Sequence, residues 1–324
     1  MNNIWGSVAQ YETIHWPWTI AMYLFLAGLS SGSIIVALLV RWNRHERDNS
    51  SIWDAMVKSG AMVAPFSILL GLFILVVDLG KPLSFYWLLI RYNFLSVMTL
   101  GVLFLCVYTP TVIVFMLLVF ERNILKSRFF FWLEGFINFV KSFHSYAHLI
   151  EYFLFFTALC VGAYTGFLLS SLYAIPMWNN PILPILFLTS GISAGIATNI
   201  IVGLLFFKST INQESIKYLL VLDLRVLLTE FPLIGMLFVG MAYAGGESLV
   251  AAKEALSTGG WALVFWVGVV GMGLFVPLII VFTALRNHVY RVGYIVLNSV
   301  VVILGVLMMR YYIIYAGQIY TGQF

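Results

Sequence analysis

Tyr164, His15 and Asp78 are the residues best suited to chemistry in this chain, because each lies near the end of a long apolar run and carries a group that can exchange a proton. The Tyr164 phenol can donate or accept a hydrogen bond, and the His15 imidazole can take up a proton near neutral pH. The Asp78 carboxyl is costly near membrane depth, and such groups are often functional. We therefore expect these three residues to be catalytic in a reaction that involves proton transfer.

Each of the three also has a simpler explanation. Tyrosine often anchors a helix at the membrane surface, and His15 lies beside Trp16 and Trp18, which are typical of an interfacial aromatic belt. Asp78 is three residues from Lys81, so it could cap a helix and form an ion pair there. Residue type and position alone leave these alternatives open.

Four further polar residues near the ends of apolar runs are candidates for holding a cofactor. Thr165 follows Tyr164, Asn180 precedes another run, and Arg310 and Gln318 lie towards the end of the last one. A charge at membrane depth usually finds a partner or a cavity, although a long side chain can also extend to the membrane surface. We expect Tyr164, Thr165, Asn180, Arg310 and Gln318 to bind the cofactor.

Eight long apolar runs must position these residues. Each approaches or exceeds the roughly 20 residues that cross the hydrocarbon core, and a backbone in lipid must satisfy its own hydrogen bonds, as a helix does. The predicted fold class is an all-α integral membrane protein with eight transmembrane helices. The predicted spans are residues 18–40, 58–78, 94–119, 148–172, 182–207, 222–244, 261–285 and 292–316.

Composition excludes several classes of function. Only 9% of the residues are charged and 62% are hydrophobic, whereas soluble domains carry about 25% charged residues. No histidine lies in the interior of an apolar run, where a haem between membrane helices would need its ligands. Cys106 and Cys160 match no metal-ligand spacing and are too few for an iron–sulfur cluster. We expect no metal, haem or iron–sulfur cluster in this chain, and no nucleic-acid partner.

The connections between the runs differ in charge. On one side of the membrane they contain only Lys81, Arg91 and Lys253. Because basic residues stay in the cytoplasm, both termini and the candidate residues near Tyr164 are predicted to face the periplasm, in a bacterial inner membrane. The basic residues on the other side include Arg41, Arg44, Arg47, Lys58, Arg122, Lys126, Arg128, Lys141, Lys208, Lys217, Arg286 and Arg291.

Two glycine motifs suggest an internal repeat. Residues 28–32 (GLSSG) and 191–195 (GISAG) each follow a Phe-Leu pair, and they lie four runs apart, so both copies would cross the membrane in the same direction. This spacing predicts a parallel repeat of two four-helix bundles. The alternative is that the small residues only allow helices to approach closely.

The predicted repeat divides the chain into two halves. An amphipathic segment at 129–143 is predicted to lie on the cytoplasmic surface or to extend the fourth span. The predicted parts are residues 1–147, with three spans and this segment, residues 148–172, which complete the first bundle, and residues 173–324, which form the second.

Several stretches resemble the membrane subunit of the polysulfide reductase/NrfD family, and together they extend over the whole chain. The stretches at 162–170 and 179–184 are specific when taken together, whereas the first ones alone would be weak. The matching stretches are residues 16–18 (WPW), 23–28 (YLFLAG), 78–82 (DLGKP), 162–170 (GAYTGFLLS), 179–184 (NNPILP) and 310–318 (RYYIIYAGQ).

The resemblance implies a quinol-oxidising subunit with eight helices that binds menaquinol or ubiquinol and holds no haem. It also implies a periplasmic ferredoxin-like 4Fe-4S partner and a terminal reductase or cytochrome c, most closely those of periplasmic nitrite reduction. The family's quinone-contacting tyrosine corresponds to Tyr164, and a polar residue ahead of the first span corresponds, less closely, to His15.

Two carboxyl groups towards the cytoplasmic side complete the set of candidates. Glu151 lies near the start of the fourth span and Glu230 about two turns into the sixth, and carboxyls in spans usually face an interior cavity. They are candidates for a proton path towards the quinone. The alternative is a structural hydrogen bond between helices.

Two other functions fit parts of the pattern. A secondary transporter also has repeats and charges within its spans, although the prolines of this chain do not pair between the halves. A passive membrane anchor of a reductase complex would need no chemistry within its spans.

Overall fold

The computed structural model describes residues 16–43, 52–78, 85–90, 93–94, 96–126, 147–207, 213–287 and 291–320. Within these residues eight helices are long and apolar enough to cross a membrane, which confirms the predicted all-α membrane fold. The amphipathic segment predicted at 129–143 lies outside the described residues. The spanning elements are α2 (Trp18–Trp42), α3 (Ile52–Asp78), α5 (Val97–Lys126), α7 (Ala147–Ser170), α8 (Leu183–Leu205), α9 (Gln213–Ala244), the run of α11 (Gly259–Leu263), η4 (Val264–Phe275) and α12 (Val276–Arg286), and α13 (Val292–Ile319).

Two helices begin well before the predicted spans. Helix α3 begins at Ile52 instead of residue 58, and α9 begins at Gln213 instead of residue 222. Hydropathy marks only the apolar part of a helix, whereas backbone hydrogen bonds continue through polar residues. Hydropathy alone would place Asp223 at the membrane interface, at the start of the sixth span. In the structure Asp223 lies ten residues into α9 and is buried.

Two helices were not predicted at all. Helix α10 (Gly246–Ser257) follows α9 directly, and a sharp turn separates the two. Gly245 and Gly246 have φ of 69° and 52°, a backbone conformation that residues other than glycine rarely adopt. A short helix α4 (Trp87–Ile90) precedes α5.

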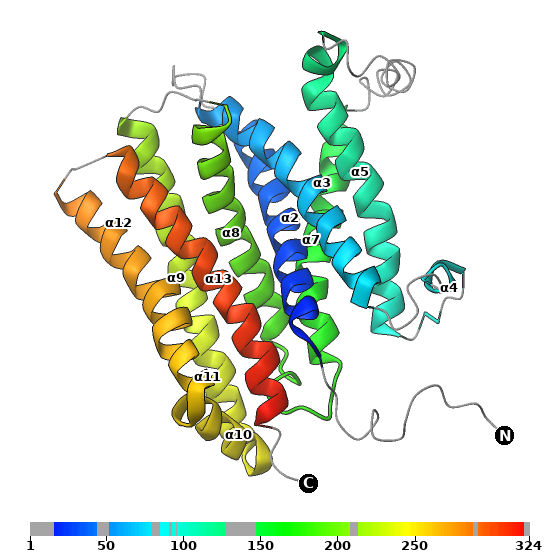
Figure 1. Ribbon diagram of the computed structural model, residues 1–324. Coiled ribbons are helices and arrows are strands. Elements are labelled where there is room, and N and C mark those ends of the chain that lie inside the picture. Colours follow the sequence, from blue (N-terminus) through cyan, green and yellow to red (C-terminus); the bar gives the residue numbers. More distant parts are fainter. Residues whose placement is uncertain are drawn as a thin grey trace.

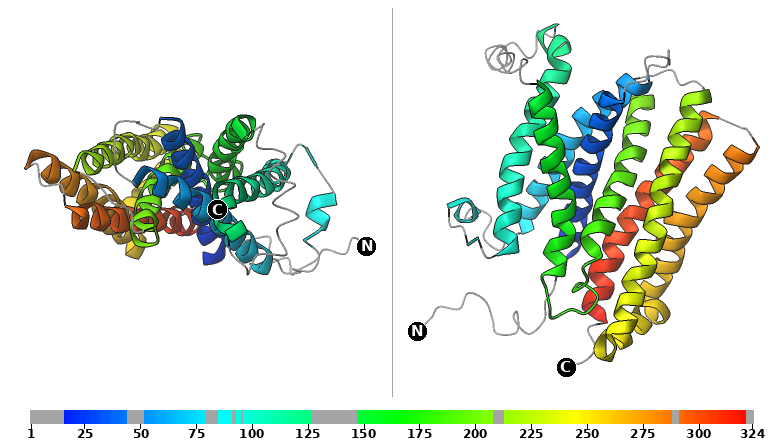
Figure 2. Two further views of the ribbon diagram at one scale, coloured as in Figure 1. Left: turned by 90° about the horizontal axis from the view of Figure 1, so that it is seen from above. Right: turned by 180° about the vertical axis from the view of Figure 1, so that it is seen from behind.

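The long helices lie side by side in one elongated assembly (Figures 1 and 2). Helices α2, α3, α5 and α7 lie on one side, and α9, α12 and α13 lie on the other, with α8 between them. Helix α8 contacts α2, α3 and α7 as well as α9 and α13. The division into two separate four-helix bundles therefore stays a prediction.

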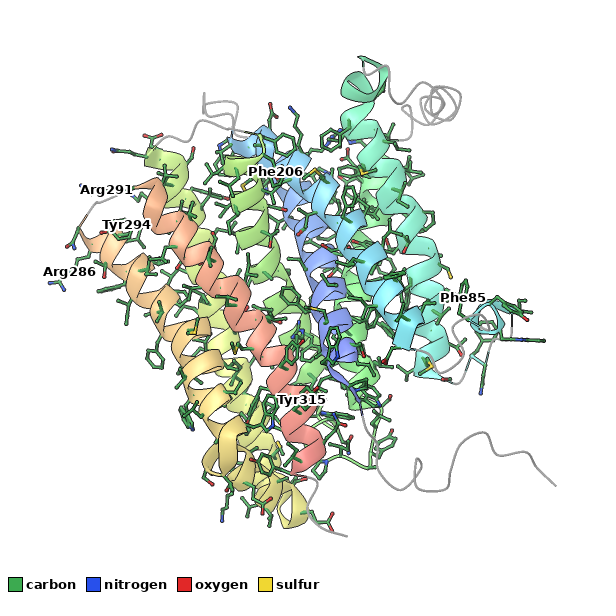
Figure 3. All side chains as sticks on the ribbon, in the orientation of Figure 1. Phe85, Phe206, Arg286, Arg291, Tyr294 and Tyr315 are labelled. Atoms are coloured by element: carbon green, nitrogen blue, oxygen red, sulfur yellow. The ribbon has the colours of Figure 1, made fainter. Side chains whose placement is uncertain are left out.

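We name the two ends of the assembly by one residue each. At the Tyr164 end, α2 begins and α13 ends, and the side chain of Gln318 bonds the main chain of Trp16. At the Arg41 end, α2 ends and α13 begins. Arg286 and Arg291 lie at the Arg41 end, where α12 ends and α13 begins (Figure 3).

The two glycine motifs meet where α2 crosses α8. A Cβ atom on Gly32 would overlap the carbonyl group of Gly191, and one on Gly195 would overlap the main chain of Gly32. One turn further along, Asn199 Nδ2 donates a hydrogen bond of 2.9 Å to Ser33 O. The motifs therefore allow the two backbones to touch, which is the packing role that small residues have at membrane helix crossings.

The crossing gives a direct stability prediction. Gly32→Ala is expected to lower the free energy of unfolding by about 1–3 kcal/mol, because the backbone of Gly191 cannot give way as a side chain would. Gly235→Ala on α9 is the matched control, since a Cβ there meets no atom within 4 Å. Thermal unfolding in detergent measures both variants, and equal melting temperatures would contradict the crossing.

Candidate functional site

The side chain of Tyr164 is buried among the helices of the first half of the chain. Its exposed fraction is 6%, and its ring packs so closely on α5 that a Cβ atom on Gly101 would overlap it. Tyr23 of α2 is also buried and lies within electrostatic range of Tyr164. A lipid-facing anchor would be exposed, so the membrane-surface explanation does not account for this tyrosine. Its ring lies against Gly101 of α5 and near Tyr23 of α2.

Asp78 lies beyond this layer towards the Tyr164 end. It is the last residue of α3, and its side chain is half-buried. Gly71, two turns earlier, packs against the ring of Tyr23, with the site of its Cβ 3.4 Å from Tyr23 Cδ2. The order along α3 thus places the Asp78 carboxyl group further towards the outside of the assembly than Tyr23 and Tyr164. His15 and Lys81 lie outside the described residues.

Three of the residues predicted to bind the cofactor form local or connecting hydrogen bonds. The Thr165 hydroxyl donates to Gly162 O of its own helix at 2.8 Å. Asn180 Nδ2 donates to Leu237 O of α9 at 3.2 Å, and its Oδ1 accepts from the backbone N–H of Ile182 at 3.0 Å. These contacts hold the connection before α8 against α9. They use one of the two N–H groups and one of the two acceptor positions of the Asn180 amide.

The side chain of Gln318 also forms hydrogen bonds that connect two segments. Its Oε1 accepts from the backbone N–H of Trp16 at 2.6 Å, and its Nε2 donates to Trp16 O at 3.0 Å. The ring of Trp16 packs on that of Trp178 with 4.9 Å between centroids, and Trp178 Nε1 donates to Ile313 O. Gln318 therefore fixes the residue next to His15 against the end of α13.

Arg310 is fully buried in the middle of the assembly. Its Nη2 donates to Phe187 O at 2.9 Å and to Ser190 Oγ at 2.8 Å, and its guanidinium lies 3.7 Å above the ring of Phe187. A Cβ on Gly28 would lie 3.3 Å from the same Nη2, so the charge lies at the crossing of α2 and α8. The alternative that Arg310 extends to the membrane surface is therefore wrong. The reason is that this face of α13 packs on α8 instead of lipid.

A line of buried polar groups continues from Arg310 towards the Arg41 end. Glu230 of α9 lies within electrostatic range of both Arg310 and Asp223, and Asp223 Oδ2 accepts a hydrogen bond of 2.6 Å from Asn298 Nδ2. Glu230 Oε1, Asp223 Oδ1 and both Nε and Nη1 of Arg310 are buried without a hydrogen-bond partner among the described residues. Such atoms need water or another polar partner. The sequence interpretation placed Asp223 at the membrane interface and did not single out Asn298, although Asp223 and Glu230 are seven residues apart and so share a helix face.

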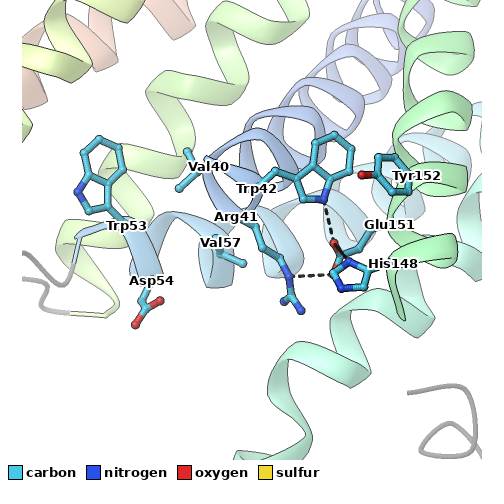
Figure 4. Close-up of a pocket in the computed structure, with 9 residues that line it drawn as sticks. All are labelled: Val40, Arg41, Trp42, Trp53, Asp54, Val57, His148, Glu151 and Tyr152. Atoms are coloured by element: carbon cyan, nitrogen blue, oxygen red, sulfur yellow. Dashed lines mark hydrogen bonds and ion pairs between the residues drawn. The ribbon is translucent and has the colours of Figure 1, made fainter. Parts of the chain in front are cut away.

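Glu151 lies at the opposite end of α7 from Tyr164, about 20 Å away along the helix. Its Oε1 is 2.8 Å from Arg41 Nε, and its Oε2 accepts from Trp42 Nε1 at 2.9 Å. His148 Nδ1 is 3.9 Å from the same Oε2. These residues line a cavity of about 490 Å³ at the Arg41 end (Figure 4). Glu151 and Glu230 have different partners, so the described contacts do not join them into one path.

The family whose model carries the description "Polysulphide reductase, NrfD" matches residues 6–322, which include all eight spans. This chain belongs to the NrfD family. It is 48% identical to a polysulfide reductase subunit of Wolinella succinogenes over 99% of this chain and 100% of that protein. It is 36% identical to "Protein NrfD homolog" of Haemophilus influenzae over 94% of both proteins, and 34% identical to "Protein NrfD" of Escherichia coli over 97% and 98%.

Membership in the NrfD family confirms the resemblance seen in the sequence. The chain is a multi-pass membrane protein of a family whose named relatives include a subunit of polysulfide reductase, which implies a reductase partner. Family and fold together are consistent with a membrane electron-transfer subunit. Among the described residues no group of three or more His, Cys, Asp or Glu side chains is placed to hold a metal ion.

Proposed function

We propose that this NrfD-family chain is the quinol-oxidising membrane subunit of a multi-subunit reductase. The observation that carries the proposal is the buried phenol of Tyr164, which lies between helices near one end of an apolar assembly. A quinol has an apolar ring and tail that suit a helix-lined cleft, and its two oxygens need hydrogen-bonding groups. Family membership supports the proposal, because a membrane electron-transfer subunit can take its electrons from a lipid-soluble carrier such as quinol.

In the proposed reaction quinol loses two electrons and two protons and leaves as quinone. The Tyr164 hydroxyl holds one quinol oxygen, and His15 holds the other and accepts a proton. Asp78, further out on α3, passes protons to the surface. Thr165, Asn180 and Gln318 position the surrounding segments, as their hydrogen bonds suggest. Arg310 balances the charge of Glu230 instead of contacting the quinol.

We place the Tyr164 end in the periplasm and both termini there, in a bacterial inner membrane. The charges support this orientation, because Arg41, Arg286 and Arg291 all lie at the other end (Figure 3). Two electrons then pass to an extrinsic ferredoxin-like 4Fe-4S subunit in the periplasm, and from there to the terminal reductase.

The terminal acceptor we favour is polysulfide or a related sulfur compound. The relative named for polysulfide reductase is 48% identical to this chain, compared with 36% and 34% for the two NrfD proteins. Nitrite reduction, which the sequence suggested, is the second candidate, and the two NrfD proteins are the observation that supports it. Purified complex supplied with menaquinol and either acceptor distinguishes the two.

We further propose that protons move along the line that contains Asp223, Glu230 and Arg310. Quinol oxidation alone releases electrons and protons on the same side, so it moves no net charge. We expect proteoliposomes that contain the complex to build up a membrane potential during turnover, and Glu230→Gln to abolish the potential while most quinol oxidation remains. A potential-sensitive dye measures this, with Glu247→Gln as the control, because Glu247 is exposed on α10. If Glu230→Gln built up an unchanged membrane potential, the line of buried polar groups would have only a structural role and would carry no protons.

The complete assembly is the right object for testing the proposed function. Complex isolated with its co-purifying subunits should oxidise menaquinol and reduce an iron–sulfur centre in the partner. A secondary transporter would instead move a substrate without any redox partner. A passive anchor would show no loss of electron flow from substitutions within its spans, except through failed assembly.

A further inference from the structure

A chain of hydrogen bonds joins α5, α2 and α3 in the first half of the chain. The hydroxyl oxygen of Tyr108 on α5 lies 2.8 Å from Ser30 Oγ on α2, and Ser30 Oγ donates to the carbonyl oxygen of Ala64 on α3 at 2.7 Å. The Ser30 hydroxyl has only one hydrogen and a carbonyl oxygen can only accept, so the Tyr108 hydroxyl is the donor to Ser30. Both side chains are fully buried. Tyr108 therefore anchors α5 to α2 through one directed hydrogen bond.

These hydrogen bonds lie about two helical turns further into the assembly than the Tyr164 ring. Tyr108 is seven residues beyond Gly101, whose backbone packs against that ring. Ser30 is likewise seven residues beyond Tyr23, which lies near Tyr164. Seven residues are close to two turns, or about 10 Å, and return to the same face of a helix. The faces of α2 and α5 that meet through Ser30 and Tyr108 are thus the faces that carry Tyr23 and Gly101.

Both α3 and α5 contain a proline at the level of these hydrogen bonds. Pro65 follows Ala64 directly, and Pro110 lies two residues after Tyr108. Proline has no N–H group, so each helix lacks one backbone hydrogen bond there and can bend more easily than an uninterrupted helix. The hydrogen bonds of the chain therefore tie α3 and α5 to α2 where the backbones of these two helices are least constrained.

Helix α5 depends on specific contacts of this kind because it lies at the outer edge of the assembly (Figure 1). Its largest contacts with other spanning helices are those with α3 and α7. Lipid chains are as apolar as the side chains between the helices, so apolar surface alone gives α5 no preferred position. Close packing and hydrogen bonds have to set that position. The hydrogen bond from Tyr108 to Ser30 restricts both the rotation of α5 and its height relative to α2.

We propose that Tyr108 is a positioning residue for quinol oxidation, an inference that rests on the proposed role of Tyr164. The Tyr108 hydroxyl fixes α5 against α2, and α5 holds the Tyr164 phenol against its own backbone at Gly101. A Cβ atom on Gly101 would overlap the phenol ring, so a shift of α5 also moves the phenol. A misplacement of about 1 Å can slow a reaction about a hundredfold. Tyr108 thus acts on the reaction through Tyr164, without touching the quinol.

Menaquinol oxidation by the complete complex with Tyr108→Phe tests the inference. The substitution removes the donor and keeps the ring, so we expect kcat to fall about tenfold while KM changes by less than about twofold. Ser30→Ala removes the acceptor and should slow the complex by a similar factor, and the double variant should be no slower than either single variant. Tyr312→Phe is the matched control, because Tyr312 is also buried and donates to Ala255 O at 3.0 Å in the second half of the chain. Its variant loses a buried hydrogen bond of the same kind but should oxidise menaquinol at the normal rate.

The same substitution in a Tyr164→Phe background separates positioning from a general structural role. If Tyr108 acts through the Tyr164 phenol, adding Tyr108→Phe to Tyr164→Phe should slow the complex no further, whereas a general loss of structure would slow both backgrounds by the same factor. A tenfold loss that persists in the Tyr164→Phe background, or an equal loss in Tyr312→Phe, would overturn the inference. A slow Tyr164→Phe together with a normal Tyr108→Phe would overturn this inference alone. A normal rate in Tyr164→Phe would overturn the proposed role of Tyr164 and this inference with it.

Discussion

Tyr164→Phe is expected to lower quinol oxidation by about a hundredfold, in the range that loss of a general acid–base group produces. The substitution removes only the hydroxyl group, and the ring that packs on Gly101 remains. The complex should therefore assemble with its partner subunits as before. Steady-state oxidation of menaquinol by the purified complex measures the effect, and the yield of assembled complex is measured on the same sample.

Tyr173→Phe is the control for this substitution. Tyr173 follows α7 at the Tyr164 end and is 82% exposed, so it shares the residue type and the location but not the buried position. Its variant should oxidise quinol at the normal rate. If Tyr164→Phe also turned over normally, the tyrosine would have no part in the reaction and its burial would be purely a matter of packing.

Arg310→Met is expected to lower the free energy of unfolding by about 3–5 kcal/mol, which is typical when one partner of a buried charge pair is removed. The variant leaves Glu230 without its nearby cation and next to Asp223, another carboxyl. It also removes the donor to Phe187 O and Ser190 Oγ at the helix crossing. Unfolding in mixed micelles, followed by loss of helical signal, measures the difference.

The double variant Arg310→Met with Glu230→Met separates charge from packing. It removes both charges, so it should recover most of the stability that the single variant loses. Arg225→Met is the control, because Arg225 is exposed on the same helix as Glu230. If Arg310→Met were as stable as Arg225→Met, Arg310 would not stabilise the buried carboxyl group of Glu230.

Much of the fold could be predicted from the sequence because lipid imposes a single requirement. A span must be apolar over its length and helical throughout, so hydropathy alone identified all eight spans. The starts of α3 and α9 were missed because charged residues lower the hydropathy there: Asp54 and Lys58 in α3, and Glu214 and Lys217 in α9. The glycine motifs correctly indicated close packing, but only the structure shows that the two motifs touch each other.

The sequence could show which residues of the site are buried polar groups. It could not show which other residues they contact. Tyr164, Glu230 and Arg310 were recognised as polar groups in apolar runs, and all three are buried. Asn180 Nδ2 donates to a carbonyl 57 residues away and Gln318 Oε1 accepts from an N–H 302 residues away, so no local pattern could show these connections between segments. The same holds for Arg41 and Glu151, which approach only when α2 and α7 pack.

Photolabelling by a quinone analogue tests most directly whether quinol binds at the Tyr164 end. The intact complex is labelled with an azido-quinone, digested, and the modified peptides are identified, with excess menaquinol as the competitor. Labels should fall on the segments of α2, α5 and α7 around Tyr23, Gly101 and Tyr164, and menaquinol should displace them. Labelling confined to the Arg41 end, or no specific labelling at all, would contradict a quinol site built around Tyr164.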